Sequence, residues 1–168
     1  MKQYLLVGTL LSFLLVACAP ETREEPVVGI MDEGPEHHLI YRPADVEWRD
    51  GPASLEPGAE FTVLEGNPGE PGVFTMRIKM PDGFRIAPHW HPNVERVTVI
   101  SGVFHLGAGK ELDKEAVEPL KPGSYTSMPP EMSHYVITEG ETVIQLTSVG
   151  PWEINYVNPE DDPRLRDS

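Results

Sequence analysis

Short runs of β-branched and aromatic residues, separated by turns rich in Gly and Pro, constrain the fold of this chain most strongly. The runs read EFTVLE, GVFTMRIKM, ERVTVIS, GSYTSM, HYVIT, ETVIQLTSV and WEINYV, with GNPGEPG, MPDG, KPG and TEG between them. Such segments predict strands bounded by turns. The best helical candidate, KELDKEAVEPL, is short, charged and closed by Pro119, and we expect a loop with at most one helical turn there. The sequence therefore predicts an all-β sandwich or barrel.

Alternation within one run predicts which side chains face the core. In VFTMRIKM, Phe74, Met76, Ile78 and Met80 share one face, because side chains at i and i+2 lie on the same side of a strand.

The N-terminus reads as a targeting segment. Residues 1–17 combine Lys2 with an apolar run from Leu5 to Val16, which is typical of a secretory signal and too short for a membrane-spanning helix. Leu15-Val16-Ala17-Cys18 resembles a bacterial lipobox, so Cys18 is predicted to be lipidated, although a signal peptide that happens to contain Cys is the alternative. By resemblance to enterobacterial sorting, Ala19 favours the periplasmic face of the outer membrane.

Composition limits the partners. The chain of 168 residues has a formal net charge of −14, which argues against nucleic acid because phosphate binding needs a basic surface. The predicted membrane contact is therefore the lipid anchor alone. Residues 18–38 are rich in Glu, Pro and Gly and are expected to form a flexible acidic tether ending at the exposed His37 and His38, while residues 39–168 form the domain.

A cluster of metal-ligand residue types stands out in the middle of the chain. His89 and His91 are two residues apart in an extended segment, so both imidazoles can reach one ion. Glu95 follows a Pro-Asn turn that can aim its carboxylate at the same point, and His134 after a Pro-rich turn is the candidate fourth ligand. Imidazole and carboxylate together suit divalent ions such as iron(II), manganese(II), nickel(II) or zinc.

The spacing of these residues resembles the two sequence motifs of the cupin superfamily. The first motif runs Gly83, five residues, His89-x-His91, three residues, Glu95, six residues, Gly102. The second runs from Gly123 through Pro129 to His134, but Glu131 stands at a position that is usually Gly and Thr138 at one that is usually Asn.

This resemblance implies a single jelly-roll barrel, the double-stranded β-helix of small bacterial cupins. It implies one divalent metal ion, with iron(II) or manganese(II) favoured and zinc or nickel as alternatives. The C-terminal run ETVIQLTSVGPWEINYVNPEDDPR is similar to an uncharacterised group that includes relatives of the cupin half of zinc anti-sigma factors.

Four further residues are candidates for the substrate pocket. Gln145 and Thr147 share a face with Val143 and Val149, and this polar pair either orients a substrate or lies on the wet face of the strand. For His105 there are two alternatives: it lines the barrel mouth, or it has a structural or surface role. The structural or surface role is favoured. Met128, near His134, is expected in the core or the pocket wall.

Three functional classes fit the predicted site. The first is an oxidoreductase of the dioxygenase or oxidase kind, acting on a small chelating organic substrate, and it is favoured because the ligand set is complete. The second is a metal-dependent isomerase or hydrolase, and the third is a module that binds or senses a ligand without turnover. A homodimer paired through an N-terminal edge strand around Leu39–Trp48 is also compatible with the pattern.

Overall fold

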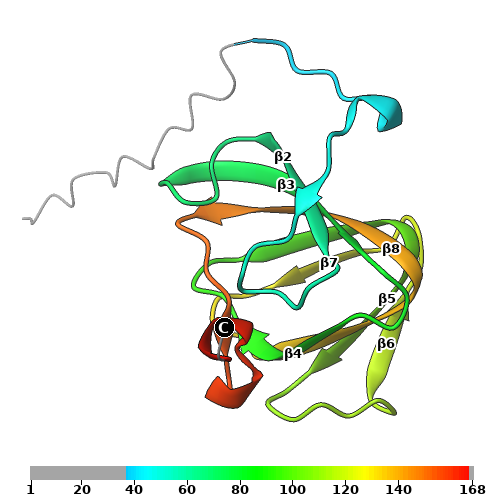
Figure 1. The fold of residues 1–168 in the computed structure, drawn as a ribbon, viewed down its shortest axis with the longest axis vertical. Helices are drawn as coiled ribbons and strands as arrows, with labels where there is room; N and C mark the ends of the chain where they lie inside the picture. Colours follow the sequence, from blue (N-terminus) through cyan, green and yellow to red (C-terminus); the bar gives the residue numbers. More distant parts are fainter. Residues whose placement is uncertain (1–36, 167–168) are drawn as a thin grey trace, which may run out of the picture.

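The computed structural model describes residues 37–166 (Figure 1). The predicted signal peptide, Cys18 and all of the predicted tether except His37 and His38 lie outside the described residues. Both of these histidines are exposed, as expected. Within residues 37–166, no helix has the length and apolar character needed to cross a membrane.

The described chain is built of antiparallel strands with three short 3-10 turns. The 3-10 turns are η1 (Pro43–Asp45), η2 (Pro159–Asp161) and η3 (Pro163–Leu165). The strands are β1 (Arg49–Asp50), β2 (Glu60–Glu65), β3 (Gly72–Met80), β4 (Arg85–Trp90), β5 (Glu95–Ala108), β6 (Val117–Leu120), β7 (Tyr125–Met128), β8 (His134–Gly150) and β9 (Asn155–Tyr156). Their order is β1-β2-β3-β8-β4-β9, and β5 pairs with β6, β7 and β8.

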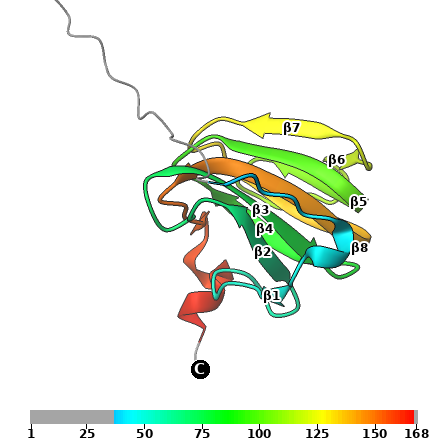
Figure 2. The same cartoon turned by 90° about the horizontal axis from the view of Figure 1, so that it is seen from above.

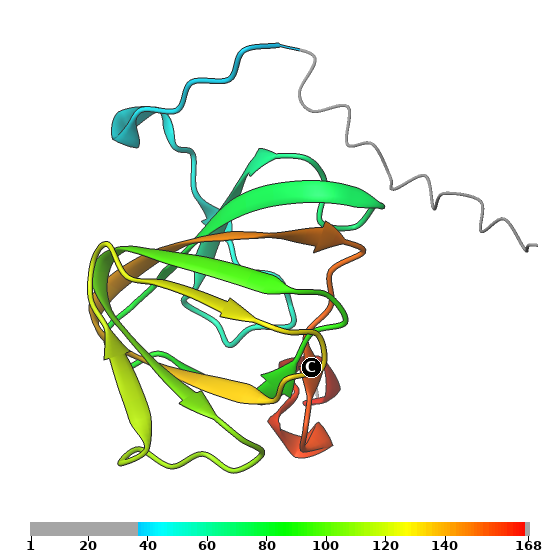
Figure 3. The same ribbon diagram turned by 180° about the vertical axis from the view of Figure 1, so that it is seen from behind.

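Two long, bent strands turn this sheet into a barrel. The C-terminal half of β8 pairs with β3 and with the start of β5, whereas its N-terminal half pairs with β4 and with the end of β5. Figure 3 shows the resulting two layers facing each other, joined where β5 and β8 bend. The bend requires glycine at Gly102, whose φ is 72° and whose Cβ would lie 2.3 Å from Thr142 Oγ1.

The core lies between the two layers. In β3, Phe74, Met76, Ile78 and Met80 are all buried, which confirms the alternation predicted from the sequence. β4, β5 and β8 contribute further buried apolar side chains, including Ile86, Val97, Val99, Phe104, Val136, Ile144 and Leu146. The barrel therefore encloses a largely hydrocarbon interior.

Three local expectations were wrong. Leu39–Trp48 contains η1 and no strand, so it supplies no edge strand for a dimer; Pro43 fixes a 3-10 turn there. The run at 110–120 ends in β6, which pairs with β5 despite its charges. HYVIT and ETVIQLTSV belong to one strand, because the TEG signal marks a bulge with Gly140 at φ 69° rather than a chain reversal.

The C-terminal segment returns to the loop that follows β1. Tyr156 Oη donates a hydrogen bond to the Ser54 carbonyl at 2.8 Å, and Arg166 pairs with Glu56. Figure 2 shows the C-terminal turns lying beside this loop at one end of the strands. These contacts place the last described residues next to the site described below.

Thr138 takes the place of the usual Asn and fastens the β3–β4 turn to β8. Its side chain is 3% exposed. Its hydroxyl donates to the Pro81 carbonyl at 2.6 Å and accepts from the Phe84 N–H at 2.9 Å. Because this turn leads directly into the strand carrying His89, Thr138 supports the site from a distance.

We expect Thr138→Val to lower the free energy of unfolding by about 1–3 kcal/mol, because it removes two buried hydrogen bonds and leaves the Phe84 N–H and the Pro81 carbonyl with only their longer contact to each other, at 3.3 Å. Thr147→Val is the matched control: its hydroxyl bonds only to Thr75 on the half-buried outer face, so its effect should stay within about 0.5 kcal/mol. Urea unfolding of both variants measures the difference, and equal losses would contradict this role for Thr138.

Candidate metal centre

Strand pairing brings three of the predicted ligands together. His89 lies near the end of β4, and its register partner is His134, the first residue of β8. The two imidazole centroids are 4.2 Å apart. His91 follows immediately after β4, with its ring centroid 4.9 Å from that of His89. Residues 45 positions apart in the chain thus share one site because β4 and β8 are neighbours.

Main-chain carbonyls orient all three rings. The Nδ1 atoms of His89, His91 and His134 each lie within hydrogen-bond distance of a carbonyl oxygen, at 2.8, 2.7 and 3.0 Å. A carbonyl only accepts, so each Nδ1 carries the hydrogen and donates it. In the neutral ring this leaves the Nε2 lone pair free to bind a metal, as in well-ordered metal sites.

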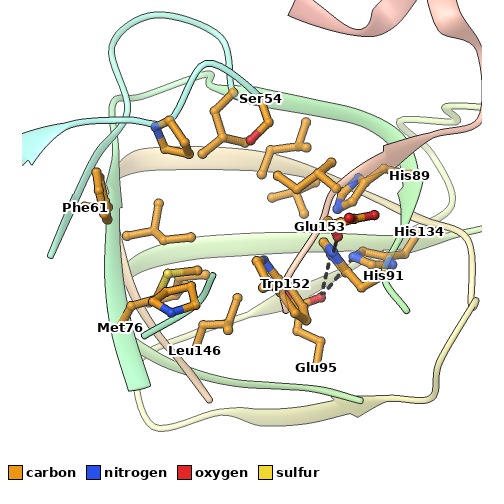
Figure 4. A pocket seen from close by; sticks show the side chains of 18 of the residues that line it. Ser54, Phe61, Met76, His89, His91, Glu95, His134, Leu146, Trp152 and Glu153 are labelled. Carbon is orange, nitrogen blue, oxygen red and sulfur yellow. Dashed lines mark hydrogen bonds and ion pairs between the residues drawn. The ribbon is translucent and has the colours of Figure 1, made fainter. Parts of the chain in front are cut away.

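The ligand atoms of the three histidines lie within 4.8 Å of one another. Glu95, the first residue of β5, adds a carboxylate: Oε2 is 3.3 Å from His91 Nε2 and 3.2 Å from His134 Nε2. Figure 4 shows these contacts as dashed lines. Glu95 makes no comparable contact with His89, so the compact cluster consists of the three histidines, with the carboxylate beside two of them.

Burial without hydrogen bonds supports a metal at this point. All four side chains are at most 6% exposed. Among residues 37–166, His91 Nε2 and Glu95 Oε2 are the two buried side-chain nitrogen or oxygen atoms without a hydrogen-bond partner, since their close approach lacks hydrogen-bond geometry. Unsatisfied buried polar atoms are costly, and coordination to a cation would satisfy both. The residues present therefore fit a divalent ion with nitrogen and oxygen ligands.

Burial and mutual contact set the charges of these four side chains. Burial lowers the pKa of His89 to about 3, and the neighbouring His134 and His91 rings act in the same direction. Burial would raise the pKa of Glu95, but its contacts with His134 and His91 outweigh burial and hold it below the usual value. Burial would likewise lower the pKa of His134, yet the Glu95 carboxylate raises it. His89 is thus neutral and Glu95 ionised at pH 7.

The cluster lies on the wall of an apolar cavity of about 230 Å³. Figure 4 shows the imidazoles on one side, and Phe61, Met76 and Leu146 on the other. Hydrocarbon side chains from β3, β4, β5 and β8 form most of the lining; polar lining residues apart from the cluster are Ser54, Glu153 and Arg164. A molecule in this cavity would meet polar atoms chiefly at the histidine cluster.

The four predicted pocket residues lie elsewhere. Gln145 and Thr147 are on the outer face of β8, where they contact Arg77 and Thr75, because Ile144 and Leu146 take the inner positions. His105 pairs with the exposed Glu139, in agreement with the surface role that was favoured. Met128 is buried in the hydrophobic core but does not line the cavity. None of the four lines this cavity, and each occupies the alternative position that the sequence left open: the outer face for Gln145 and Thr147, the surface for His105 and the core for Met128.

Two residues that contact the site were missed. Trp152 stacks on His91, with ring centroids 3.9 Å apart and planes 17° from parallel. The Glu153 carbonyl is the acceptor for His91 Nδ1. Both lie in the run WEINYV, but nothing local in that run indicates a neighbour 61 or 62 positions earlier, because the fold alone brings them together.

The fold and site define a protein with the cupin barrel. Solved structures with this fold include an RmlC-like cupin from Shewanella frigidimarina, with 18% identity over 69% of this chain and 92% of that one, at a TM-score of 0.52. The polyketide cyclase RemF from Streptomyces resistomycificus shares 18% identity over 76% and 91%, with a TM-score of 0.59. An acetylacetone dioxygenase from Acinetobacter johnsonii shares 17% identity over 76% and 82%, with a TM-score of 0.58.

Within that class, the chain belongs to the family DUF4437, described as a domain of unknown function, which matches residues 39–155. No curated protein matches the chain. The family match includes the histidine cluster, Glu95 and Trp152, but ends before the C-terminal turns that carry Arg164.

The lowered pKa of His89 predicts acid sensitivity of the protein after treatment with a chelator. Between pH 6.5 and about 3 the unfolded chain binds a proton at His89 that the folded chain does not, so the free energy of unfolding should fall as pH falls. The slope from this group is at most about 1.4 kcal/mol per pH unit. His134, whose pKa is raised by Glu95, opposes this slope near pH 6.5, where the unfolded chain is still taking up its proton, and adds none well below that pH, whereas Glu95 adds to the loss near and below its usual pKa.

Denaturant unfolding at several pH values between 6.5 and 5 measures this effect. His89→Gln should give a shallower slope than the wild type, while His105→Gln, on the surface beside Glu139, should leave it unchanged. Parallel slopes for wild type and His89→Gln would show that His89 is not the buried neutral group.

Proposed function

We propose that this protein is a mononuclear metal-dependent oxidoreductase that acts on a small chelating organic substrate. In this proposal His89, His91, His134 and Glu95 hold one divalent ion, with iron(II) or manganese(II) favoured over zinc or nickel. The observation that carries it is the convergence of three oriented imidazoles and a carboxylate on the wall of an otherwise apolar cavity.

The cavity favours a substrate with its polar atoms at one end. A chelating group such as a β-diketone or an enediol would reach the cluster, and a hydrocarbon portion would contact Met76 and Leu146. The acetylacetone dioxygenase with the same fold supports this direction, because its substrate is a small diketone. In a dioxygenase reaction dioxygen is the oxidant, both of its atoms enter the products, and no separate reductant is consumed.

The residues of the chain have defined tasks in this proposal. The carbonyl-bonded Nδ1 atoms keep each imidazole in the tautomer that leaves Nε2 free. Glu95 supplies negative charge beside His91 and His134, which favours a cation at the cluster. The apolar wall keeps bulk water away from the substrate and strengthens electrostatic interactions near it. A bound divalent ion would supply Lewis-acid and, for iron or manganese, redox chemistry.

A non-redox isomerase or hydrolase is the second candidate. The polyketide cyclase RemF overlaps this chain at a TM-score of 0.59, so a similar barrel also accompanies a cyclisation activity. A metal acting only as a Lewis acid would need the same ligands and the same apolar cavity, and a non-catalytic binding module would need them as well. Metal identity and oxygen uptake distinguish these candidates from the oxidoreductase.

Export as a Cys18-anchored lipoprotein is part of the proposal and rests on the sequence Leu15-Val16-Ala17-Cys18. An envelope location would place the cavity where small organic compounds enter the cell. The acidic character of the chain agrees with attachment through lipid alone, rather than through a basic surface.

Elemental analysis of the purified protein tests the site. We expect one divalent ion per chain in the wild type and in the surface control His105→Ala, and a large loss in His89→Ala, His91→Ala and His134→Ala. Glu95→Gln tests the carboxylate, since a fall in metal content in this variant shows that the charge or the coordination of Glu95 helps to hold the ion. Equal metal content in wild type and His91→Ala would refute the assigned centre.

Oxygen consumption tests the reaction. Protein loaded anaerobically with iron(II) should consume dioxygen when acetylacetone or another chelating diketone, acid or enediol is added, and His134→Ala should not. Leu146→Phe narrows the cavity away from the cluster, so we expect a raised KM with the metal content unchanged. Full metal loading without oxygen uptake on any of these compounds would favour the non-redox candidate.

A further inference from the structure

His91 differs from the other two histidines in what holds its ring. His89 and His134 donate from Nδ1 to carbonyls two residues earlier, those of Ala87 and Met132, so each is oriented by its own segment. His91 lies in the turn between β4 and β5 and donates instead to Glu153, 62 residues later in the chain. Its orientation therefore depends on a segment outside the two strands that it joins.

That segment also covers one face of the His91 ring. The Trp152 indole stacks on the imidazole at a centroid distance of 3.9 Å and an angle of 17°. Such near-parallel contact restricts rotation of the imidazole about its side-chain bonds. The carbonyl contact of Glu153 and the stacking of Trp152 thus fix two independent features of His91, the direction of Nδ1 and the plane of the ring.

The segment itself is anchored on both sides. The main-chain N–H of Trp152 donates to the Pro68 carbonyl at 2.7 Å, and the indole makes a T-shaped contact with Phe74, which is 0% exposed, with ring centroids 5.8 Å apart. Gly150 packs so closely on the 67–70 turn that a Cβ would lie 2.1 Å from the Glu70 carbonyl oxygen. From the opposite direction, Asn93 Nδ2 donates to the Val149 carbonyl at 2.9 Å, which ties the turn carrying His91 to the end of β8.

From these contacts we infer that Trp152 is a positioning residue for the metal ligand His91, and that its stacked indole sets part of the metal affinity of the site. This inference rests on the proposed metal centre. Trp152 also lines the cavity, so the same side chain touches both the compartment for substrate and the ligand that it orients. Hydrogen-bonding partners of a ligating histidine commonly contribute about 10- to 100-fold to metal affinity, and we expect an effect in this range from Trp152 because it holds the ring plane and precedes Glu153, whose carbonyl is that partner.

Titration of the chelator-treated full chain with Ni²⁺ tests the inference. Trp152→Leu keeps apolar bulk but removes the stack, and we expect a Kd for Ni²⁺ raised by about 10- to 100-fold. Trp152→Phe restores an aromatic face and should recover most of the affinity. Trp48→Leu is the matched control: Trp48 lies beneath Lys79 away from the cluster and should leave the Kd unchanged.

A double-mutant cycle separates positioning from a general structural role. In a His91→Ala background, Trp152→Leu should have little further effect on Ni²⁺ binding by the remaining ligands, because the ring that it orients is gone. A loss as large as in the His91-containing protein would overturn the inference. Thermal unfolding of each variant reports whether it is folded, and Trp152→Phe supplies the comparison if Trp152→Leu does not fold.

Tryptophan fluorescence supplies a second readout. Ni²⁺ bound next to His91 should quench Trp152 emission strongly, so Trp152→Phe should lose part of the quenching that the wild type and Trp48→Leu retain. Equal Ni²⁺ affinity in wild type and Trp152→Leu would overturn this inference alone. A wild type that binds no Ni²⁺ and contains no other metal would overturn the proposed function together with it.

Discussion

Three hydrogen bonds from imidazole Nδ1 atoms to main-chain carbonyls determine what this barrel can do chemically. Without them, each ring could rotate and change tautomer, and the three Nε2 atoms would have no reason to converge. With them, the ligand atoms gather within 4.8 Å. Two of the carbonyls belong to the segments that carry the histidines themselves, so the strand geometry that forms the barrel also orients the rings. The third carbonyl makes the site depend on the chain beyond β8.

The cost of the arrangement lies in its buried polar groups. A buried carboxylate without compensation is unfavourable, and so is a buried imidazolium. The contact between Glu95 and His134 offsets this burial cost, because it lowers the pKa of the carboxyl and raises that of the imidazole. His89 avoids the cost of a buried imidazolium because its lowered pKa keeps the ring neutral. The site is thus a compromise between ion pairing and neutrality, and a bound cation would take over the role of His134 as the positive partner of Glu95.

The sequence was sufficient for the features that depend on local patterns. β2 and β3 follow their alternating runs, and the spacing of His89, His91 and Glu95 indicated a site because i and i+2 geometry is a property of any strand. Whether Gln145 faces the barrel interior or the outside could not be predicted in this way. The C-terminal half of β8 lies between β3 and β5, so its outer face is half-buried as well as its inner face buried, and only the register with β3 and β5 shows that Ile144 and Leu146 face the cavity. Trp152 was not predictable for a related reason, since its partner is defined by the return of the chain and not by spacing.

The two departures from the cupin motifs show how the fold accommodates unusual residues near the site. Thr138 forms hydrogen bonds to the β3–β4 turn with a hydroxyl that both donates and accepts.

Glu131 keeps the backbone conformation of the glycine that is usual at its position: its φ is 62°, and no other non-glycine residue in the 37–166 range has a positive φ. A side chain in this conformation costs about 1 kcal/mol or more. The Glu131 N–H donates to the His91 carbonyl at 2.8 Å, so the turn before His134 is fastened to the residue that Trp152 covers. Strain at Glu131 is therefore retained where the turn joins two of the ligands, and His91 is held by main-chain contacts on both sides, through its carbonyl to Glu131 and through its ring to Glu153.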